Sequence, residues 1–426
     1  MPVPLESKPD QSASSPQKQQ KSQSIPPEAV FALGFTLLAI TTFATSISMQ
    51  TSQALQPSFM RDVLGMDGAQ NGYLIAIREL PGFLLIFVAA VLMRLGLARA
   101  AALSLVIMGV GYSLFSLTDS FNQLIIPTLI ASIGFHSWLQ LQPALGLSIA
   151  KPGQEGSTLG RLNSIGFLGS LITLTAVLLL LLGIERFRGD LRTFQEPYLR
   201  GLFLVVGVAA IIGAIAIFRF PTSDSDIAAA RAAPRIVWRR EYRLYYALSF
   251  LDGSRQQIYF AFAPFVLVEE FNVNARSITV LLIVSALLNW RTGALVGRMV
   301  DLHGEKRVLS VAYVLHFVVF LGFAFSNSVW LLYVFYLGYL WLFLFYVGTT
   351  TYLRKIAHRE DVPASLAMGV SLAHLTAIVV PIIGAALWSR LGYQFPFLFG
   401  TVFCVMSLYL TRKIDIPKQQ IANRTG

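Results

Sequence analysis

Long apolar runs dominate this sequence, and each is long enough to cross a lipid bilayer as a helix. Charged residues make up only 13% of the chain and hydrophobic residues 55%, whereas soluble domains carry about 25% charged residues. The composition therefore excludes an ordinary soluble domain and predicts an all-α integral membrane protein. The twelve expected transmembrane helices lie near residues 30–54, 70–93, 98–117, 122–150, 157–184, 199–219, 243–269, 276–300, 306–325, 329–355, 364–390 and 393–412.

Polar segments divide the chain into two halves of six spans each. The N-terminal tail is rich in Gln, Ser, Pro and Lys and lacks the apolar side chains that a folded core needs, so we expect it to be disordered. The expected parts are an N-terminal tail at 1–29, an N-terminal six-helix bundle at 30–219, a linker at 220–242, a C-terminal six-helix bundle at 243–412 and a C-terminal tail at 413–426.

The distribution of basic residues predicts the orientation. The 33 Lys and Arg residues lie between the apolar runs and not in one basic domain, which favours membrane orientation over nucleic-acid binding. With both termini in the cytoplasm, 23 of them fall on the cytoplasmic side, 7 on the opposite side and 3 within spans. This bias predicts cytoplasmic N- and C-termini in a multi-pass protein of the cell membrane.

The residues that carry cofactor or catalytic chemistry elsewhere are scarce in this sequence. Cys404 is the only cysteine, and no nucleotide-binding loop, metal-ligand spacing or nucleophile signature appears. We therefore expect no cofactor, no metal site and no enzyme activity.

A glycine-bounded basic segment occurs once in each half. The stretch 297–307, between the eighth and ninth spans, has a weaker copy at 89–99, between the second and third. Asp301 corresponds to Met93, Gly304 to Gly96 and Arg307 to Arg99, each pair 208 residues apart. One offset for all three pairs indicates an internal duplication of the kind found in membrane transporters.

The chain resembles the major facilitator superfamily of transporters over nearly its full length beyond residue 29. The resemblance rests on the spacing Gly-x-x-x-Asp-x-x-Gly-x-Lys-Arg, on its weaker copy, and on the stretches Pro381–Gly384 and Gly392–Phe397 in the last two spans. It implies two six-helix bundles that rock about a central cavity, which opens alternately to either side of the membrane. The signature positions are Gly297, Asp301, Gly304, Lys306 and Arg307.

Asp301 is a candidate conformational latch. A carboxylate at this helix end can face the positive end of the fifth span, near Gly156 and Ser157, and stabilise a state closed on the cytoplasmic side by about 1 to 2 kcal/mol. Gly297 and Gly304 would permit a close backbone approach. The alternative is that Asp301 only solvates a tight loop.

The first half lacks this carboxylate, because Met93 occupies the aspartate position and Ala89 the first glycine. The corresponding latch there cannot be electrostatic. We therefore expect an asymmetric gate in which the eighth span carries more of the closure energy.

Ionisable residues inside apolar spans are the best indication of a functional site. Placing one at the bilayer centre costs about 2.5 to 3.5 kcal/mol of insertion free energy, so such residues are expected to have partners or water around them. In the seventh span, four polar side chains recur at helical spacing and share one face, which the resemblance places toward the central cavity. An ion network that only stabilises the fold is an equally strong interpretation. The candidates are Arg78, Glu79 and Arg291, together with Asp252, Arg255, Gln256 and Tyr259 of the shared face.

Arg78, Glu79, Asp252, Arg255 and Arg291 carry one surplus positive charge when all are ionised. The surplus predicts an anionic or amphipathic organic solute, with Arg291 or Arg255 as its counter-charge. Asp252 is our first candidate for binding a coupling proton, because its tie to Arg255 can be exchanged, and Glu79 is the second.

The fourth span adds His136 and Gln140, which share a face and could line the cavity. Packing is the more ordinary role for such a histidine. His316 and His374 have no partner at helical spacing, so we assign them no role.

Together these features predict a secondary transporter that moves a small solute, with protons, through the lipid bilayer as a monomer. Two rivals remain: a receptor or scaffold built on a transporter fold, and a lipid flippase. Ion-pair mutants that preserve all activity would favour the receptor or scaffold, and whether solutes or labelled lipids stabilise the protein against heat would distinguish a transporter from the flippase.

Overall fold

A computed structural model describes residues 27–84, 95–150, 155–189, 195–221, 238–358 and 361–415, and these residues form helices and connecting turns. The first half contains α1 (Pro27–Ser58), α2 (Gly68–Phe83), α4 (Leu97–Phe115), α5 (Phe121–Ile149), α6 (Glu155–Arg188) and α7 (Gln195–Phe218). The second half contains α9 (Arg243–Glu269), α10 (Ala275–His303), α11 (Glu305–Phe325), α12 (Val329–Leu342), α13 (Val347–Ile356), α14 (Val362–Leu391) and α15 (Gln394–Thr411).

Each of the twelve expected spans contains a helix. The tenth span consists of α12 and α13, joined by the short 3-10 helix η5 (Phe343–Tyr346). Within the described residues, nine helices are long and apolar enough to cross a membrane, and α10, which bends by 44°, would be a tenth. The described part of α2 is only 16 residues long and carries two charged side chains. The all-α membrane class is confirmed, and hydropathy supports nine or ten of the twelve spans.

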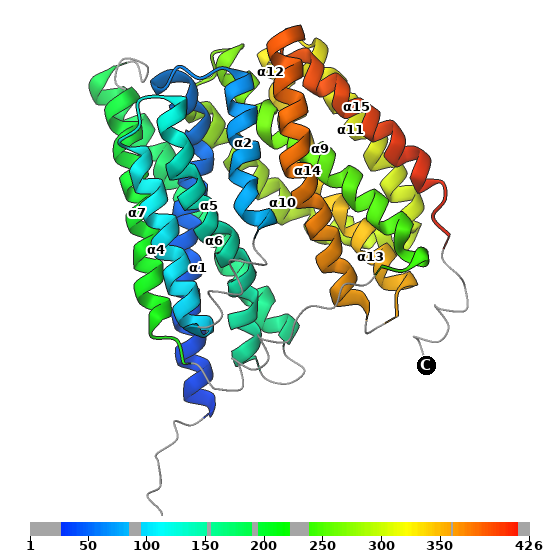
Figure 1. Ribbon diagram of the computed structural model, residues 1–426, viewed down its shortest axis with the longest axis horizontal. Helices are drawn as coiled ribbons and strands as arrows, with labels where there is room; N and C mark the ends of the chain where they lie inside the picture. Colours follow the sequence, from blue (N-terminus) through cyan, green and yellow to red (C-terminus); the bar gives the residue numbers. More distant parts are fainter. Residues whose placement is uncertain are drawn as a thin grey trace, which may run out of the picture.

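The helices gather into two groups, which we call the N-terminal bundle (helices within 27–221) and the C-terminal bundle (helices within 238–415). Figure 1 shows the first bundle on the left and the second on the right. We call the side where α1 begins and α15 ends the terminal face, and the other side the opposite face. Successive helices cross between these faces, as the short connections require.

Contacts between the bundles include the packing of α2 against α14 and of α6 against α10. At Gly68, an added Cβ would overlap the Trp388 ring. At Gly72 it would lie 2.8 Å from Phe262 and 2.9 Å from the Ala385 Cβ. Glycine is therefore what allows α2 to approach α14 so closely near the opposite face.

Small residues also hold the N-terminal bundle together. A Cβ at Gly134 of α5 would overlap the Ser104 carbonyl oxygen in α4, and one at Gly111 of α4 would overlap the Ala131 backbone in α5. Close backbone approach of this kind drives helix association where lipid tails remove the hydrophobic advantage of burial.

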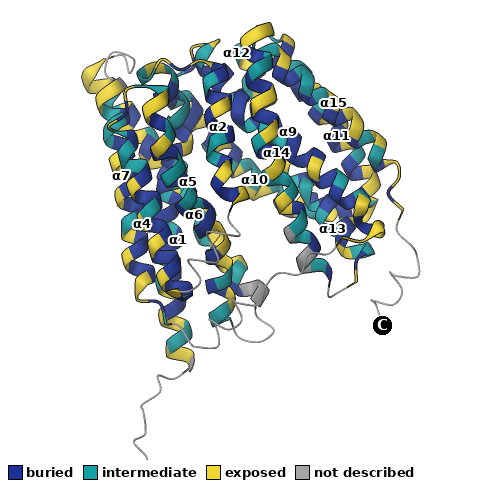
Figure 2. Cartoon of the chain, viewed as in Figure 1, coloured by how far each residue is buried: buried dark blue, intermediate teal, exposed yellow. Residues whose placement is uncertain are grey.

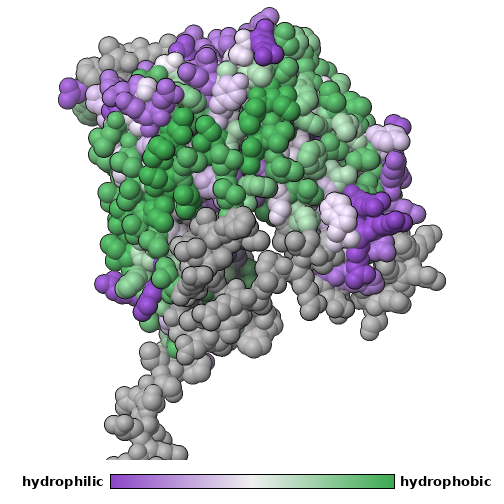
Figure 3. Space-filling view, in the orientation of Figure 1, coloured by the Kyte–Doolittle hydropathy of each residue, from purple (hydrophilic) through white to green (hydrophobic). Residues whose placement is uncertain are grey.

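Apolar side chains cover the outside of the molecule, as a bilayer-embedded surface requires. Figure 2 shows that exposed residues line the outer helix faces, and Figure 3 shows a hydrophobic belt across the middle of the visible face, with polar residues above it. The exposed apolar residues on the outer helix faces include Phe167, Leu179 and Val208, which are 62%, 63% and 54% exposed. Such exposure is expected for lipid contact.

Several predicted features lie outside the described residues. These are most of the N-terminal tail, Ala89 and Met93 of the first-half motif, most of the linker, and the end of the C-terminal tail.

Candidate functional site

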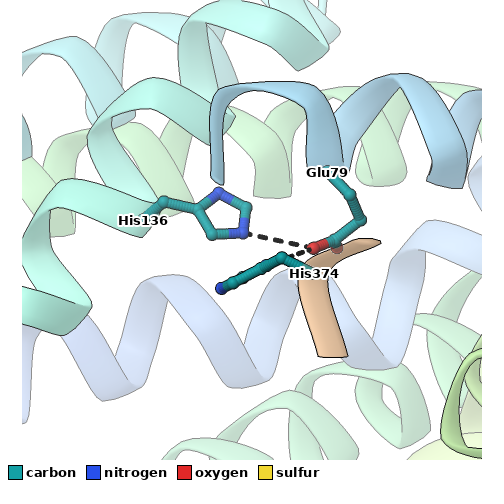
Figure 4. Close-up of side chains that lie close together, drawn as sticks. All are labelled: Glu79, His136 and His374. Atoms are coloured by element: carbon teal, nitrogen blue, oxygen red, sulfur yellow. Dashed lines mark hydrogen bonds and ion pairs between the residues drawn. The ribbon is translucent and has the colours of Figure 1, made fainter. Parts of the chain in front are cut away.

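Three ionisable side chains from three helices meet near mid-depth of the molecule. Glu79 comes from α2 and His136 from α5, whereas His374 comes from α14 in the other bundle (Figure 4). The Glu79 Oε2 atom lies 3.3 Å from Nε2 of His136 and 3.4 Å from Nδ1 of His374. His374 is 12 residues into α14, so the group lies roughly 18 Å along that helix. We call these three residues the cross-bundle cluster.

Glycine makes room for the cross-bundle cluster. A Cβ at Gly82 would lie 2.8 Å from Nε2 of His136 and 3.0 Å from Nδ1 of His374. Gly82 is one turn after Glu79, so its missing side chain lets both rings approach the carboxylate. Glu79 and His136 are buried, and the His374 side chain is 22% exposed.

Hydrogen bonds fix the orientation of the His136 ring. The Ser132 hydroxyl donates to the carbonyl oxygen of Arg78, so its single proton is not available to His136. Nδ1 of His136 lies 3.0 Å from both the Ser132 carbonyl and the Ser132 hydroxyl oxygen, and both are then acceptors. Nδ1 therefore carries a proton, and Nε2 is the atom directed at Glu79.

Arg78 pairs with its neighbour Glu79, through Nη2 at 2.9 Å and Nε at 3.2 Å from Oε1. Adjacent residues point about 100° apart on a helix. The long arginine side chain spans that angle. It holds Oε1 and leaves Oε2 to the two histidines.

A second polar cluster lies inside the C-terminal bundle. Arg255 forms an ion pair with Asp252 and donates to the Ser407 hydroxyl in α15. Its guanidinium lies 4.4 Å from the centre of the Tyr313 ring in α11. The Thr349 hydroxyl of α13 donates to Asp252 over 2.9 Å. Four helices of one bundle thus supply this cluster.

The cavity beside this pair has a volume of about 30 Å³, enough for one or two water molecules. Its lining includes Asp252, Arg255, Gln256 and His316. The shared polar face that the sequence predicted is therefore present, but this part of it faces α11, α12 and η5 within one bundle. That placement differs from the inter-bundle cavity implied by the resemblance, because helical spacing specifies a face and not its neighbour.

Tyr259 belongs to an aromatic layer on the same face. Its ring stacks on Tyr339 with centroids 3.7 Å apart, and its hydroxyl donates to the carbonyl oxygen of Tyr336 over 2.7 Å. All three side chains are buried. Their contacts are those of interhelix packing.

Two predicted residues lie at the surface. Arg291 on α10 is exposed, not buried as predicted, and shares its helix face with the exposed Val280, Val284 and Leu287. Gln140 on α5 is also exposed, although His136 one turn earlier is buried.

The duplicated motif forms matching hinges in the two halves. Gly304 ends α10 and precedes α11 with φ 76° and ψ 155°, and Gly96 precedes α4 with φ 81° and ψ 158°. Positive φ favours glycine at both positions. The shared angles confirm the sequence relation between these two glycines.

The predicted latch residues do not meet the other bundle through a close glycine contact. Among the residues that the structure describes, no atom lies within 4 Å of a Cβ built at Gly297 or Gly304. Asp301, Lys306 and Arg307 are exposed.

Sequence reasoning missed three charged contacts. His374 joins the cross-bundle cluster, Glu305 is buried and lies 2.6 Å from the Lys355 ammonium, and Arg276 of α10 pairs with Glu185 of α6 across the bundles. Each partner comes from a distant helix, so no local spacing could reveal it.

Known proteins share this fold. The sequence model of the Major Facilitator Superfamily matches residues 244–425, and no curated protein matches the chain. A mutant form of the nucleoside transporter NupG is similar in structure, with a TM-score of 0.72 at 14% identity over 89% of this chain and 99% of that one.

Two further solved structures are similar at 14% identity. A D-xylose-proton symporter has a TM-score of 0.69 and covers 90% of this chain and 98% of its own. A bacterial homologue of the human lysosomal transporter Spinster, in an inward-facing and occupied conformation, has a TM-score of 0.65 and covers 95% and 98%. The second half of the chain thus matches the sequence model of the Major Facilitator Superfamily, and the whole chain shares its fold with these transporters, with no subfamily identified.

Proposed function

We propose that the protein is a secondary active transporter that moves a small organic solute by alternating access. The observation that carries the proposal is the unequal contact between its two bundles. On the opposite face, Gly68 and Gly72 bring α2 against α14, and Arg276 pairs with Glu185. At the terminal face, a Cβ at Gly297 or Gly304 would meet no atom of the described residues within 4 Å. A pair of bundles closed on one side only is an end state of such a cycle.

The Lys and Arg distribution supports a cell-membrane protein with both termini in the cytoplasm. In that orientation the terminal face is cytoplasmic and the arrangement is inward-facing. Asp301 would then reach the start of α6 only after the bundles close on the cytoplasmic side, where it would stabilise the outward-open state by about 1 to 2 kcal/mol.

The charge pairing supports an anionic or amphipathic solute. Arg78 pairs with Glu79 and Arg255 with Asp252, so Arg291 is the cation that these pairs leave over. Arg291 is exposed on the helix face that also carries Val280, Val284 and Leu287, so it can serve as the counter-charge only where that face meets the solute path. Arg255 is committed to three partners inside its bundle.

We assign the coupling proton to Asp252. Its carboxylate is buried beside a cavity that can hold water, and its partners Arg255 and Thr349 can compensate a change of its charge. Proton exchange at this position would alter the packing of α9 against α11 and α13, which are elements of one moving bundle.

The test uses purified protein in proteoliposomes. A panel of organic anions, nucleosides and sugars is first screened for thermal stabilisation, and stabilising solutes are then assayed for uptake with and without a pH gradient. The proposal expects uptake that the gradient accelerates, loss of that acceleration in Asp252→Asn, and weaker uptake of anions in Arg291→Ala. Unchanged gradient dependence in Asp252→Asn contradicts the proton assignment. Stabilisation by lipids alone, with no solute uptake, contradicts solute transport.

A further inference from the structure

The cross-bundle cluster contains the side-chain types that bind transition metals. The ligand atoms of Glu79, His136 and His374 all lie within 4.8 Å of one another. Two imidazole nitrogens and one carboxylate oxygen suit Zn²⁺ and its first-row neighbours, whereas Ca²⁺ and Mg²⁺ prefer oxygen ligands. Three protein ligands also leave one coordination position open.

The distances fit a shared ion. Ligands of a tetrahedral zinc ion with bonds of about 2.0 to 2.2 Å lie about 3.3 to 3.6 Å apart. Oε2 of Glu79 is 3.3 Å from one ring nitrogen and 3.4 Å from the other. The two ring nitrogens lie within 4.8 Å of each other, and the His374 ring, which is partly exposed, would have to turn to bring them to the tetrahedral separation.

The hydrogen bonds leave a place for a positive species. Ser132 holds Nδ1 of His136 and so directs Nε2 at Oε2 of Glu79, which lies 3.3 Å away. Either a proton or a metal ion can lie between these two atoms, and metal-binding measurements distinguish the two. The hydrogen bond from a metal-binding histidine to a backbone carbonyl is also the usual support for such a ligand.

The surroundings of the cluster support the same conclusion. Gly82 leaves open the point that lies 2.8 and 3.0 Å from the two ring nitrogens. Arg78 orients Glu79 by holding Oε1. The positive charge of Arg78 opposes a cation, so the affinity should be lower than that of a closed structural zinc site. Because its side chain is 31% exposed, solvent weakens this opposition.

We propose that Glu79, His136 and His374 bind one divalent transition-metal ion, which ties the two bundles together in the arrangement seen here. His374 comes from α14, and the other two ligands come from the N-terminal bundle. An ion held by both bundles must be released, or lose a ligand, before they separate. The inference is independent of the proposed solute and of the proton at Asp252.

The first experiment measures metal binding by the full chain, purified in detergent, stripped with a chelator and freed of any affinity tag. Zn²⁺ should raise the melting temperature by at least about 2 °C at 100 times its Kd, with one ion bound per chain. Glu79→Gln, His136→Gln and His374→Gln should each weaken binding at least about tenfold. The exposed His358 provides the matched control, because His358→Gln should leave the Kd unchanged.

A variant that keeps all three ligands protects the test against misfolding. Gly82→Ala places a methyl group 2.8 and 3.0 Å from the two ring nitrogens, so the rings must shift and Zn²⁺ binding should weaken, while the metal-free melting temperature shows whether the fold is kept. Zn²⁺ stabilisation that is equal in wild type and His374→Gln would overturn the bridging site, as would stabilisation by Ca²⁺ to the same extent. Absence of any Zn²⁺ response in wild type would overturn the metal site altogether.

Discussion

Gly72 provides a direct test of the contact that closes the opposite face. In Gly72→Ala, the new methyl group would lie 2.8 Å from Phe262 and 2.9 Å from the Ala385 Cβ, whereas ordinary contacts are 3.4–4 Å. The Phe262 ring can move aside, but the Ala385 Cβ is fixed to the α14 backbone. We therefore expect α2 and α14 to separate.

The size of the effect follows from overpacking, which costs about 1 to 3 kcal/mol. This cost applies only while α2 and α14 are in contact. The gain in helix propensity from glycine to alanine applies equally to both states and cancels. The ratio of the two conformations should therefore shift about 5- to 150-fold toward the state that is closed at the terminal face.

The assay measures a distance distribution by pulsed electron paramagnetic resonance. Spin labels at the exposed positions Asn163 of α6 and Leu302 of α10 report on the terminal face, in a Cys404→Ser background. Gly72→Ala should enrich the shorter distance. Gly183→Ala is the control, because a Cβ there meets no atom within 4 Å. A lower melting temperature with unchanged distances would refute the reasoning, since local repacking would then have absorbed the methyl group.

Three further predictions concern stability, each measured as the free energy of unfolding or the melting temperature in detergent. Asp252→Asn leaves the buried Arg255 charge without its partner and should lower the free energy of unfolding by about 3 to 5 kcal/mol. The double variant Asp252→Asn with Arg255→Gln should lose less stability than the single variant, and an equal or larger loss would contradict the ion pair. Gly304→Ala should lower the free energy of unfolding by about 1 to 2 kcal/mol, because alanine is strained at the φ of 76° found there. Gly297→Ala lies in an α-helix where a Cβ meets no atom of the described residues within 4 Å, so it should not destabilise the protein. Equal losses in the two variants would contradict backbone strain at Gly304. Tyr259→Phe removes a hydrogen bond to a buried carbonyl and should cost about 1 kcal/mol, and an unchanged stability would show that this bond contributes nothing.

Features that depend on local sequence could be predicted from the residues alone. Apolar length identified the helical segments, because a bilayer requires about 20 residues per span. The offset between Gly96 and Gly304 predicted an internal duplication, and both glycines have nearly the same backbone angles. The helical segments and the paired glycines depend only on the sequence of one segment or on the spacing between the two halves, so hydropathy and spacing are sufficient to predict them.

The cross-bundle cluster could be found only in part. Glu79 and His136 were candidates because polar residues in apolar spans are costly, but His374 had no role, since its partner lies on α2 in the other half. Helical spacing also placed Asp252 and Arg255 on one face without showing that this face looks into its own bundle. Which helices pack together decides both points, and packing depends on residues such as Gly72 and Gly82 that carry no chemistry of their own.

The most direct test of alternating access is to measure distances across both faces of the same protein. Labels at Asn163 and Leu302 report on the terminal face, and labels at Leu117 and Trp330, which are 72% and 75% exposed, report on the opposite face. Across wild type and Gly72→Ala, our account predicts that one distance lengthens whenever the other shortens. Distances that stay fixed, or that lengthen together on both faces, would contradict it.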